Sequence, residues 1–365
     1  MVHGEFRWVT IQSDDAAGVN VTHMWWSAHA VRRCYLARAM SPNPESGLSY
    51  VTFSRAEWAA LRANTPLTLV EADLAALRGL NEPITLDEVA AVILPLSRLL
   101  NLHITAVQQL VQVTDTFLGR PSLPVPFVIG VAGSVAAGKS TISRVLREVL
   151  ARWDAHHNVA LLTTDGFLHP NAVLEARGLM QRKGFPESYD LPRLVHFLAD
   201  IKAGRDAVAP VYSHLTYDIV PDQFVTVRRP EVLIIEGINV LQPAPNSAER
   251  GAKTVVSDFF DFSIFIDADE VSLKRWYVAR FLKLRDTAFQ SPESYFHRFA
   301  RLTEDAARTT AERIWDEINA VNLKQNIEAT RDRATVVLRK ADSHAVEEVS
   351  LRRALALAPP AARDA

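Results

Sequence analysis

The 365-residue sequence has a single cysteine, Cys34, and almost no net charge. One cysteine allows neither an intrachain disulfide nor a metal site built from several thiolates, and it fits a reducing cytosol. The 40 Lys and Arg residues against 42 Asp and Glu give a formal net charge of −2. Because neutralising nucleic-acid phosphates needs a clustered cationic excess, the composition disfavours a nucleic-acid partner and favours a small-molecule substrate.

Long apolar runs are also lacking. We find no apolar stretch of the roughly 18 to 20 residues that cross a bilayer. The first 40 residues contain no compact apolar segment followed by a small-residue cleavage site. We therefore expect a cytoplasmic protein that neither spans a membrane nor is exported.

The most informative feature that is present is the run GSVAAGKS, residues 133–140. It fits GxxxxGK[ST], in which backbone N–H groups surround nucleotide phosphates, the lysine reaches the β and γ oxygens and the hydroxyl binds Mg²⁺. An apolar run at 127–132 predicts the preceding strand, and helical spacing over 141–153 predicts the following helix. The sequence therefore predicts a site for ATP and Mg²⁺ formed by Gly133, Ser134, Val135, Ala136, Ala137, Gly138, Lys139 and Ser140.

The rest of the chain predicts an α/β fold. Helical patterns cover 54–80 and 85–118, before the phosphate loop. Short buried-strand patterns follow at 159–163, 232–235, 262–266 and 335–338, separated by helical stretches. Strands that alternate with helices predict a doubly wound, mostly parallel sheet flanked by helices, with a helical segment in front of it.

Two acidic residues follow predicted strands. Asp165 comes after 159–163, at the sheet edge where open α/β folds bind ligands, and we interpret it as the base that accepts a substrate hydroxyl proton. The alternative is a cap of the next turn. Glu236 follows 232–235 and is interpreted as a carboxylate near the metal that acts through water. Its alternative is a strand-end carboxylate in a polar turn.

Aromatic and basic residues gather in two further segments. Residues 210–218, PVYSHLTYD, are interpreted as a loop whose tyrosines and histidine enclose an organic substrate. In 276–285, helical spacing places Tyr277, Arg280 and Leu284 on one face, where an arginine beside aromatic rings can bind transition-state charge. That pattern alone favours an amphipathic surface helix.

Seven blocks of the sequence resemble the motifs of the prokaryotic type I pantothenate kinases. They are GSVAAGKST at 133–141, TTDGFLHPN at 163–171, RGLMQRKGFPESYD at 177–190, PVYSHLTYD at 210–218, IIEGINVLQ at 234–242, VSDFFDFSIFIDA at 256–268 and NLKQNI at 322–327. The resemblance runs from about Val51 to Arg353. It implies a P-loop kinase fold, a homodimer, and transfer of the ATP γ-phosphoryl group to the terminal hydroxyl of pantothenate, which opens coenzyme A biosynthesis.

The resemblance also implies residue roles. Lys139, Ser140 and Thr141 would hold phosphate and Mg²⁺, Asp165 would act as base and substrate anchor, and Arg280 would meet transition-state charge. Pantothenate would be held by Tyr212, His214, Tyr277 and Asn319, and the adenine would lie between Asn81 and His344. Coenzyme A would be a feedback inhibitor that competes with ATP, with its phosphates at Lys139, Arg144 and His214.

Two positions depart from the resemblance. Leu284 stands where some relatives have an aromatic residue, and Phe299 stands where a tyrosine is expected. We expect catalysis to persist, with altered affinity and altered tolerance of pantothenate analogues.

The resemblance also limits the domains. We interpret residues 46–353 as one P-loop kinase domain and the Ala/Pro-rich residues 354–365 as a frayed tail. Residues 1–45 are interpreted as an extension that is disordered or not translated natively, because Met40 offers an alternative start before the turn-rich residues 41–47. N-terminal mass spectrometry of the native protein tests this start.

Two other functions compete with this interpretation. A uridine kinase or phosphoribulokinase relative shares the phosphate loop, the following Asp and a Tyr/His substrate loop, but PESYD and NLKQNI favour the pantothenate kinases. A regulatory protein that senses coenzyme A without turnover is disfavoured by Lys139, Asp165 and Arg280, because a sensor needs no base.

Overall fold

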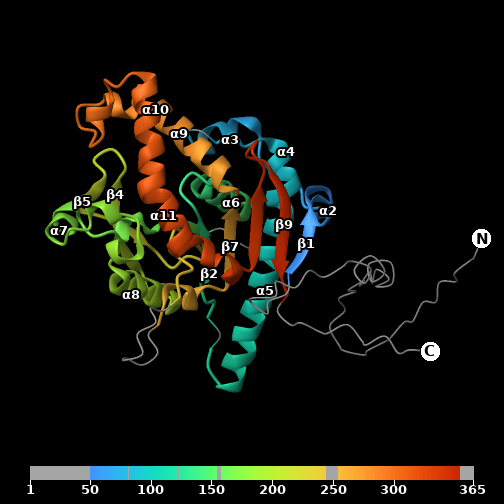
Figure 1. Cartoon of the computed structure of the whole chain (residues 1–365). Helices are drawn as coiled ribbons and strands as arrows, with labels where there is room; N and C mark the ends of the chain where they lie inside the picture. Colours follow the sequence, from blue (N-terminus) through green and yellow to red (C-terminus); the bar gives the residue numbers. More distant parts are fainter. Residues whose placement is uncertain (1–49, 81, 122, 154–157, 244–253, 354–365) are drawn as a thin grey trace, which may run out of the picture. The chain divides into compact units, whose positions relative to one another are not determined.

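The computed structural model describes residues 50–80, 82–121, 123–153, 158–243 and 254–353 (Figure 1). The predicted extension at 1–45, the tail at 354–365 and Asn81 lie outside these ranges, so the predictions made for them stay predictions.

A seven-stranded sheet forms the centre of the described chain. Its strands run in the spatial order β1 (Tyr50–Ser54), β9 (Val346–Arg352), β8 (Val336–Lys340), β7 (Phe262–Asp267), β2 (Phe127–Gly133), β6 (Val232–Glu236) and β3 (Val159–Thr163). The five strands from β8 to β3 are parallel, and β9 and β1 are antiparallel to their neighbours. The predicted mostly parallel α/β sheet is therefore confirmed.

Burial explains why the central strands were visible in the sequence. Every residue of β2 and of β6 is buried, which requires the continuous apolar runs that parallel strands covered on both faces show. The strands β1 and β9 were missed, because their exposed and half-buried residues give a weaker pattern.

Helices flank this sheet (Figure 1). They are α2 (Arg55–Ala60), α3 (Glu71–Leu77), α4 (Leu86–Glu88), α5 (Leu94–Phe117), α6 (Lys139–Ala151), α7 (Asn171–Ala176), α8 (Leu191–Lys202), α9 (Glu270–Asp286), α10 (Glu304–Ile314) and α11 (Ala320–Asn322). Three π-helical turns, at Val89–Ile93, Trp315–Asn319 and Leu323–Ile327, continue neighbouring α-helices. Short 3₁₀ segments include Thr164–Phe167 and Glu328–Arg333.

The helix expected over 54–80 was wrong in its middle. Residues 55–60 and 71–77 are helical, but the chain between them is not. Ala63 takes a positive φ of 50°, and Pro66 lacks the N–H that a continuing helix needs. The helix expected over 85–118 is confirmed, since α4, one π-helical turn and α5 run on without a break.

The segment 210–218 is not a loop, which corrects the earlier interpretation. It belongs to a hairpin of β4 (Ala207–Ser213) and β5 (Asp218–Val227), which form a separate two-stranded sheet. Tyr217, in the connecting turn, has a positive φ of 54°. Pro210 hid the strand from sequence reasoning, because proline fits only an edge strand or an irregular pairing, and the register shifts between Pro210 and Tyr212.

The expectation that no apolar stretch has the length of a membrane span was also wrong. Residues Leu86–Phe117 form one helix long and apolar enough to cross a membrane, and 50% of its most apolar window is buried inside the protein. Residues on its first half, among them Leu94, Leu96 and Leu100, are buried in the core. Burial in the core thus accounts for the apolar composition of the first half of this segment.

Candidate active site

The phosphate loop joins β2 to α6, and its backbone has the conformation that the glycines permit. Gly138, the residue before α6, has a left-handed φ of 92°. A Cβ atom on Gly138 would lie 2.5 Å from Nζ of Lys340, so no larger residue fits without a shift. The loop therefore presents the first N–H groups of a 13-residue helix, which is a site suited to phosphate.

Lys139 lies among the carboxylates of the site. Its ammonium donates a hydrogen bond to the Ser134 carbonyl oxygen at 2.7 Å. Burial lowers the pKa of Lys139, and the negative charges of Glu236 and Asp165 oppose this shift. The predicted phosphate-binding lysine and the two predicted acidic residues are thus brought to one place.

Glu236 ends β6 between the two strands that carry the other groups. In the sheet register it pairs with Val131 on β2 and with Thr163 on β3. Burial raises the pKa of its carboxyl, while a hydrogen bond from Ser140 and the charge of Lys139 lower it. Its Oε2 atom is buried without a hydrogen-bond partner among the described residues, so one carboxylate oxygen beside Ser140 is left for another ligand.

Asp165 follows β3 in the 3₁₀ segment Thr164–Phe167 and faces the β4–β5 hairpin. Its Oδ2 atom lies 3.9 Å from Nε2 of His214. Burial raises the pKa of Tyr212, and the charge of Asp165 adds to that rise. The structure therefore brings Asp165, His214 and Tyr212 together, and their roles stay predictions.

Tyr212, His214 and Tyr277 form what we call the aromatic wall of the site. The rings of Tyr212 and His214 meet edge to face with centroids 5.2 Å apart. Burial raises the pKa of Tyr277 to about 12, and a hydrogen bond with Asn319 opposes that rise. The charge of Arg280 lowers the pKa of both Tyr277 and Lys139, so this arginine lies near the tyrosine and near the phosphate-loop lysine.

His344 lies in the turn between β8 and β9. Its ring stacks on Trp276 with centroids 4.1 Å apart and planes inclined by 21°. Burial and the charge of Lys340 lower the pKa of His344 to about 4. The ring is therefore neutral near pH 7 and offers a flat face for stacking.

Thr141 and Arg144 lie one helical turn apart on α6. Arg144 Nη2 donates to Thr141 Oγ1 at 3.2 Å, and the Glu82 carboxylate accepts from the same hydroxyl. Arg144 Nε also donates to the Leu77 carbonyl oxygen at 2.9 Å. These contacts attach α3 and the residues after it to the helix that starts at the phosphate loop.

Leu284 and Phe299 lie in a second apolar cluster with Phe281 and Phe289. Tyr277 packs against this cluster and against the main core. The two positions that depart from the resemblance therefore lie next to the aromatic wall. The consequences expected for pantothenate analogues stay predictions.

Sequence reasoning missed two lysines that contact the site. Lys340 donates from Nζ to the Ala137 carbonyl oxygen at 3.0 Å, across 203 residues of chain. Lys183 donates to Asn171 Oδ1 at 2.6 Å and lies 4.0 Å from the centre of the Tyr217 ring. Lys183 lies within the block 177–190 that resembles the pantothenate kinases, and this block was the sequence signal that could have indicated it. No local sequence pattern indicates Lys340.

Comparisons with known proteins agree with this geometry. Residues 128–286 match the profile of the Phosphoribulokinase / Uridine kinase family. A protein of Sorangium cellulosum (strain So ce56) named pantothenate kinase is 60% identical over 306 residues, which cover 84% of this chain and 98% of that protein. This chain belongs to the pantothenate kinase family.

A second pantothenate kinase, from Rhodopseudomonas palustris (strain TIE-1), is 57% identical over 305 residues, 83% of this chain and 96% of that protein. Among solved structures, D-glycerate 3-kinase from Cryptococcus neoformans var. grubii is 15% identical, with a TM-score of 0.47, and the match covers 69% of this chain and 97% of that one. Membership of the pantothenate kinase family confirms the resemblance and, with the parallel sheet, the P-loop kinase fold.

Proposed function

We propose that the protein is an ATP-dependent pantothenate kinase, which transfers the γ-phosphoryl group of ATP to pantothenate and yields 4'-phosphopantothenate. This is the first step of coenzyme A biosynthesis. The observation that carries the proposal is the approach of Asp165 and His214, 3.9 Å apart, beside the phosphate loop of a chain that belongs to this family.

The residues divide the reaction between them. Asp165 anchors the terminal hydroxyl of pantothenate and accepts its proton as the oxygen attacks the γ-phosphorus. Lys139 and Arg280 offset the negative charge that spreads over the transferring group. Tyr212, His214, Tyr277 and Asn319 hold the body of pantothenate, and the neutral ring of His344, with Asn81, flanks the adenine.

Ser140 and Glu236 fit a magnesium ion that accompanies ATP. The unpartnered Oε2 atom of Glu236 is an oxygen ligand of the kind Mg²⁺ prefers, either directly or through water. Kinase sites bind Mg²⁺ with one or two carboxylates together with substrate phosphates. The ion supplies positive charge to the β- and γ-phosphates when it is bound.

Coenzyme A is proposed as a feedback inhibitor of the same site. Its phosphates would meet Lys139, Arg144 and His214, in competition with the phosphates of ATP. The position of Arg144 on α6, in contact with Thr141, supports an anion site that extends from the phosphate loop along the first turns of this helix.

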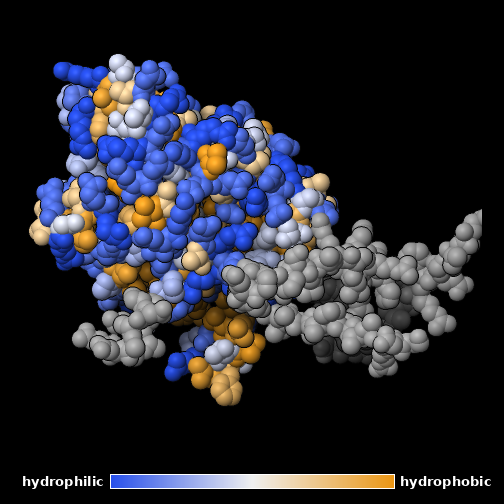
Figure 2. All heavy atoms as spheres, viewed as in Figure 1, coloured by the Kyte–Doolittle hydropathy of each residue, from blue (hydrophilic) through white to orange (hydrophobic). Residues whose placement is uncertain are grey.

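A homodimer that acts in the cytoplasm is the proposed physiological form. The second half of α5 projects from the rest of the described chain and carries an apolar surface (Figures 1 and 2). Leu110, Val113 and Phe117 on this half are 66%, 66% and 87% exposed. An apolar helix face of this kind is buried in a partner more often than it is left in water.

Release of ADP by the purified protein tests the function. We expect release to depend on pantothenate with ATP and Mg²⁺ present, and to fall when coenzyme A is added. Dependence on uridine in place of pantothenate would assign the chain to a uridine kinase activity. Binding of coenzyme A without any turnover would favour the regulatory sensor.

A further inference from the structure

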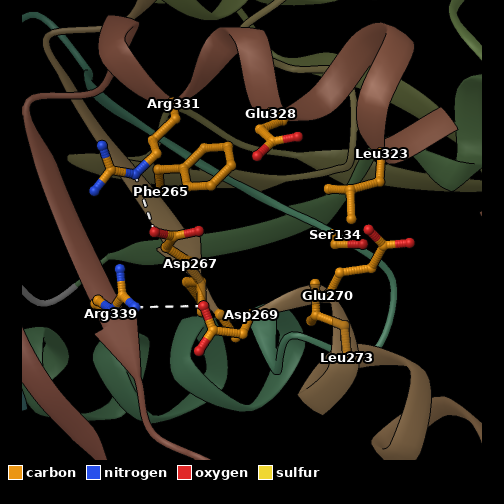
Figure 3. Close-up of a pocket in the computed structure, with 12 residues that line it drawn as sticks. Ser134, Phe265, Asp267, Asp269, Glu270, Leu273, Leu323, Glu328, Arg331 and Arg339 are labelled. Atoms are coloured by element: carbon orange, nitrogen blue, oxygen red, sulfur yellow. Dashed lines mark hydrogen bonds and ion pairs between the residues drawn. The ribbon is translucent and has the colours of Figure 1, made fainter. Parts of the chain in front are cut away.

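A cavity of about 410 Å³ opens beside the phosphate loop, at the carboxyl end of β7. Figure 3 shows that its walls come from this strand end, from the start of α9, from Leu323–Arg333 and from β8. Of the described residues assigned to the kinase site, Ser134 alone lines it. The volume lies within the range of small-molecule sites.

The charges that line the cavity favour a cation. Four carboxylates face two guanidinium groups there. Arg331 pairs with Asp267 at 3.0 Å and Arg339 with Asp269 at 3.3 Å, so both arginines are neutralised locally. Glu270 pairs with Lys324, so the carboxylate of Glu328 carries the remaining charge of the lining, and an anionic ligand would meet it without an unpaired arginine among the lining residues.

Glu270 and Glu328 differ in their surroundings. Glu270 forms an ion pair with Lys324 at 2.9 Å, and the side chain of this lysine is 60% exposed. Glu328 lies on the Glu328–Arg333 segment and is exposed toward the cavity (Figure 3). A cationic group can therefore approach Glu328 without first breaking a buried ion pair.

Ser134 is the independent sign of a ligand. It is 3% exposed, and its hydroxyl is buried without a hydrogen-bond partner among the described residues. Figure 3 shows this hydroxyl facing the same space as the Glu270 carboxylate. Buried hydroxyl groups are normally paired, so this one is available to a ligand that enters the cavity.

The walls indicate an organic ligand. Phe265, Leu273 and Leu323 contribute apolar surface and are 3%, 2% and 8% exposed. Among the described residues, no group of three or more His, Cys, Asp or Glu is placed to hold a metal ion. A bare ion would also leave most of this volume unfilled.

We propose that the cavity binds a small organic amine in its cationic form and that its occupation changes the affinity for ATP. The ammonium group lies at Glu270 and Glu328, the apolar body lies against Phe265 and Leu273, and the inner end reaches the Ser134 hydroxyl. This regulatory site is separate from the proposed transfer of phosphate to pantothenate.

The coupling to ATP follows from the backbone. Ser134 presents its hydroxyl to the cavity, and its carbonyl oxygen accepts the hydrogen bond from Lys139 at 2.7 Å. The preceding Gly133 packs so closely on β7 that a Cβ atom there would lie 2.5 Å from the Ile266 carbonyl oxygen. A ligand between β7 and α9 therefore acts on both ends of the loop that binds phosphate, and its positive charge favours the bound nucleotide.

The test uses three probes of one shape and different charge: benzylamine, benzyl alcohol and benzoate. We expect saturation-transfer NMR on the full chain to detect benzylamine, with millimolar affinity, and not benzoate. Saturating benzylamine should raise the affinity for ATP about twofold to fivefold, and ATP should raise the affinity for benzylamine by the same factor.

Two variants test whether benzylamine binds in this cavity. Glu328→Gln should weaken benzylamine at least about threefold and leave ATP binding unchanged, because one charge interaction near the surface is lost. Glu175→Gln, at an exposed glutamate on α7, is the matched control and should change neither. Equal binding of all three probes, absence of benzylamine binding, or its displacement by ATP would each overturn the proposal. None of these results depends on whether pantothenate is phosphorylated.

Discussion

At the scale of single residues, Asp165 is proposed as the base and as the anchor of the substrate hydroxyl. Its carboxylate lies 3.9 Å from His214, and among the described residues no backbone N–H donates to this carboxylate, as it would if the side chain were a helix cap. Its own N–H donates to the Thr163 hydroxyl at 3.3 Å, so the turn is capped by the threonine. The Asp165 carboxylate therefore does not form the turn cap of the alternative interpretation, and its role as the base stays a proposal.

Asp165→Asn should separate chemistry from nucleotide binding. The amide keeps the shape of the side chain but accepts no proton, so we expect the rate of phosphoryl transfer to fall by about 10² to 10⁴. Calorimetric titration should show ATP affinity close to that of the unchanged protein. Asp206→Asn, at an exposed aspartate, is the control. A parallel loss of ATP binding in Asp165→Asn would make this residue structural.

His344 gives a prediction about pH. Because its pKa falls from 6.5 to about 4 on folding, the unfolded chain binds the proton first as the pH decreases. The contribution of this residue to the free energy of unfolding is therefore complete above pH 6.5 and is lost as the pH falls toward about 4.

Denaturant unfolding of His344→Asn measures this contribution. Asparagine tolerates the positive φ of 71° at this position but has no titrating group. We expect the variant to lose less stability than the unchanged protein between pH 7 and pH 4.5, and NMR titration should give a His344 pKa well below 6.5. Parallel pH curves for the two proteins would show that His344 titrates as an exposed histidine.

At the scale of elements, the phosphate loop depends on the conformation of Gly138. Gly138→Ala places a methyl group 2.5 Å from Nζ of Lys340 and opposes a φ of 92°, so the Lys340 side chain must move and the loop backbone is strained. We expect ATP binding to weaken at least about tenfold, measured by calorimetry. Gly204→Ala is the matched control, because Gly204 has a φ of 68° with no atom within 4 Å of the added methyl group. Equal weakening of ATP binding by both variants would mean that backbone strain alone, and not the contact with Lys340, causes the loss.

The β4–β5 hairpin depends in turn on Lys183. Its ammonium donates to Asn171 Oδ1 at 2.6 Å and to the Tyr217 carbonyl oxygen, although burial lowers its pKa to about 8. The lysine therefore fixes the turn that carries Tyr217 to the start of α7.

Lys183→Met should loosen this turn and the aromatic wall next to it. We expect KM for pantothenate to rise about tenfold while KM for ATP stays unchanged, since the phosphate loop is not touched. Lys183→Arg keeps the charge and should recover part of the loss. Steady-state kinetics with each substrate varied in turn distinguish this outcome from a general loss of folding, which would change both constants.

Elements also show what the sequence could predict. The strands β2, β6 and β7 are buried on both faces, and their apolar runs were read correctly. The hairpin was missed because Pro210 interrupts β4 and most of β5 is exposed, and the edge strand β1 was missed because most of its residues are half-buried or exposed. The phosphate loop, Asp165 and Glu236 lie at strand ends in the sequence. The contact of Lys340 with Ala137 instead depends on β8 and β2 lying on the two sides of β7, and the two residues are 203 positions apart in the chain.

At the scale of the whole molecule, the apolar second half of α5 accounts for the proposed homodimer. Leu110, Val113 and Phe117 follow one another at spacings of three and four residues, so they share one helix face. Leu102, eight residues before Leu110, is 54% exposed and extends this face toward the core. Two such faces packed against each other would form a seam of the kind that paired helices use.

Val113→Glu should therefore shift the protein from dimer to monomer. A carboxylate in the centre of an apolar seam must be desolvated without a partner, which should weaken self-association at least about tenfold in sedimentation equilibrium. Gln112→Glu adds the same charge next to it on the exposed helix and should leave association unchanged. Both variants should bind ATP, because the phosphate loop lies on other elements. A Val113→Glu protein that remains as dimeric as the Gln112→Glu control would place the dimer interface elsewhere.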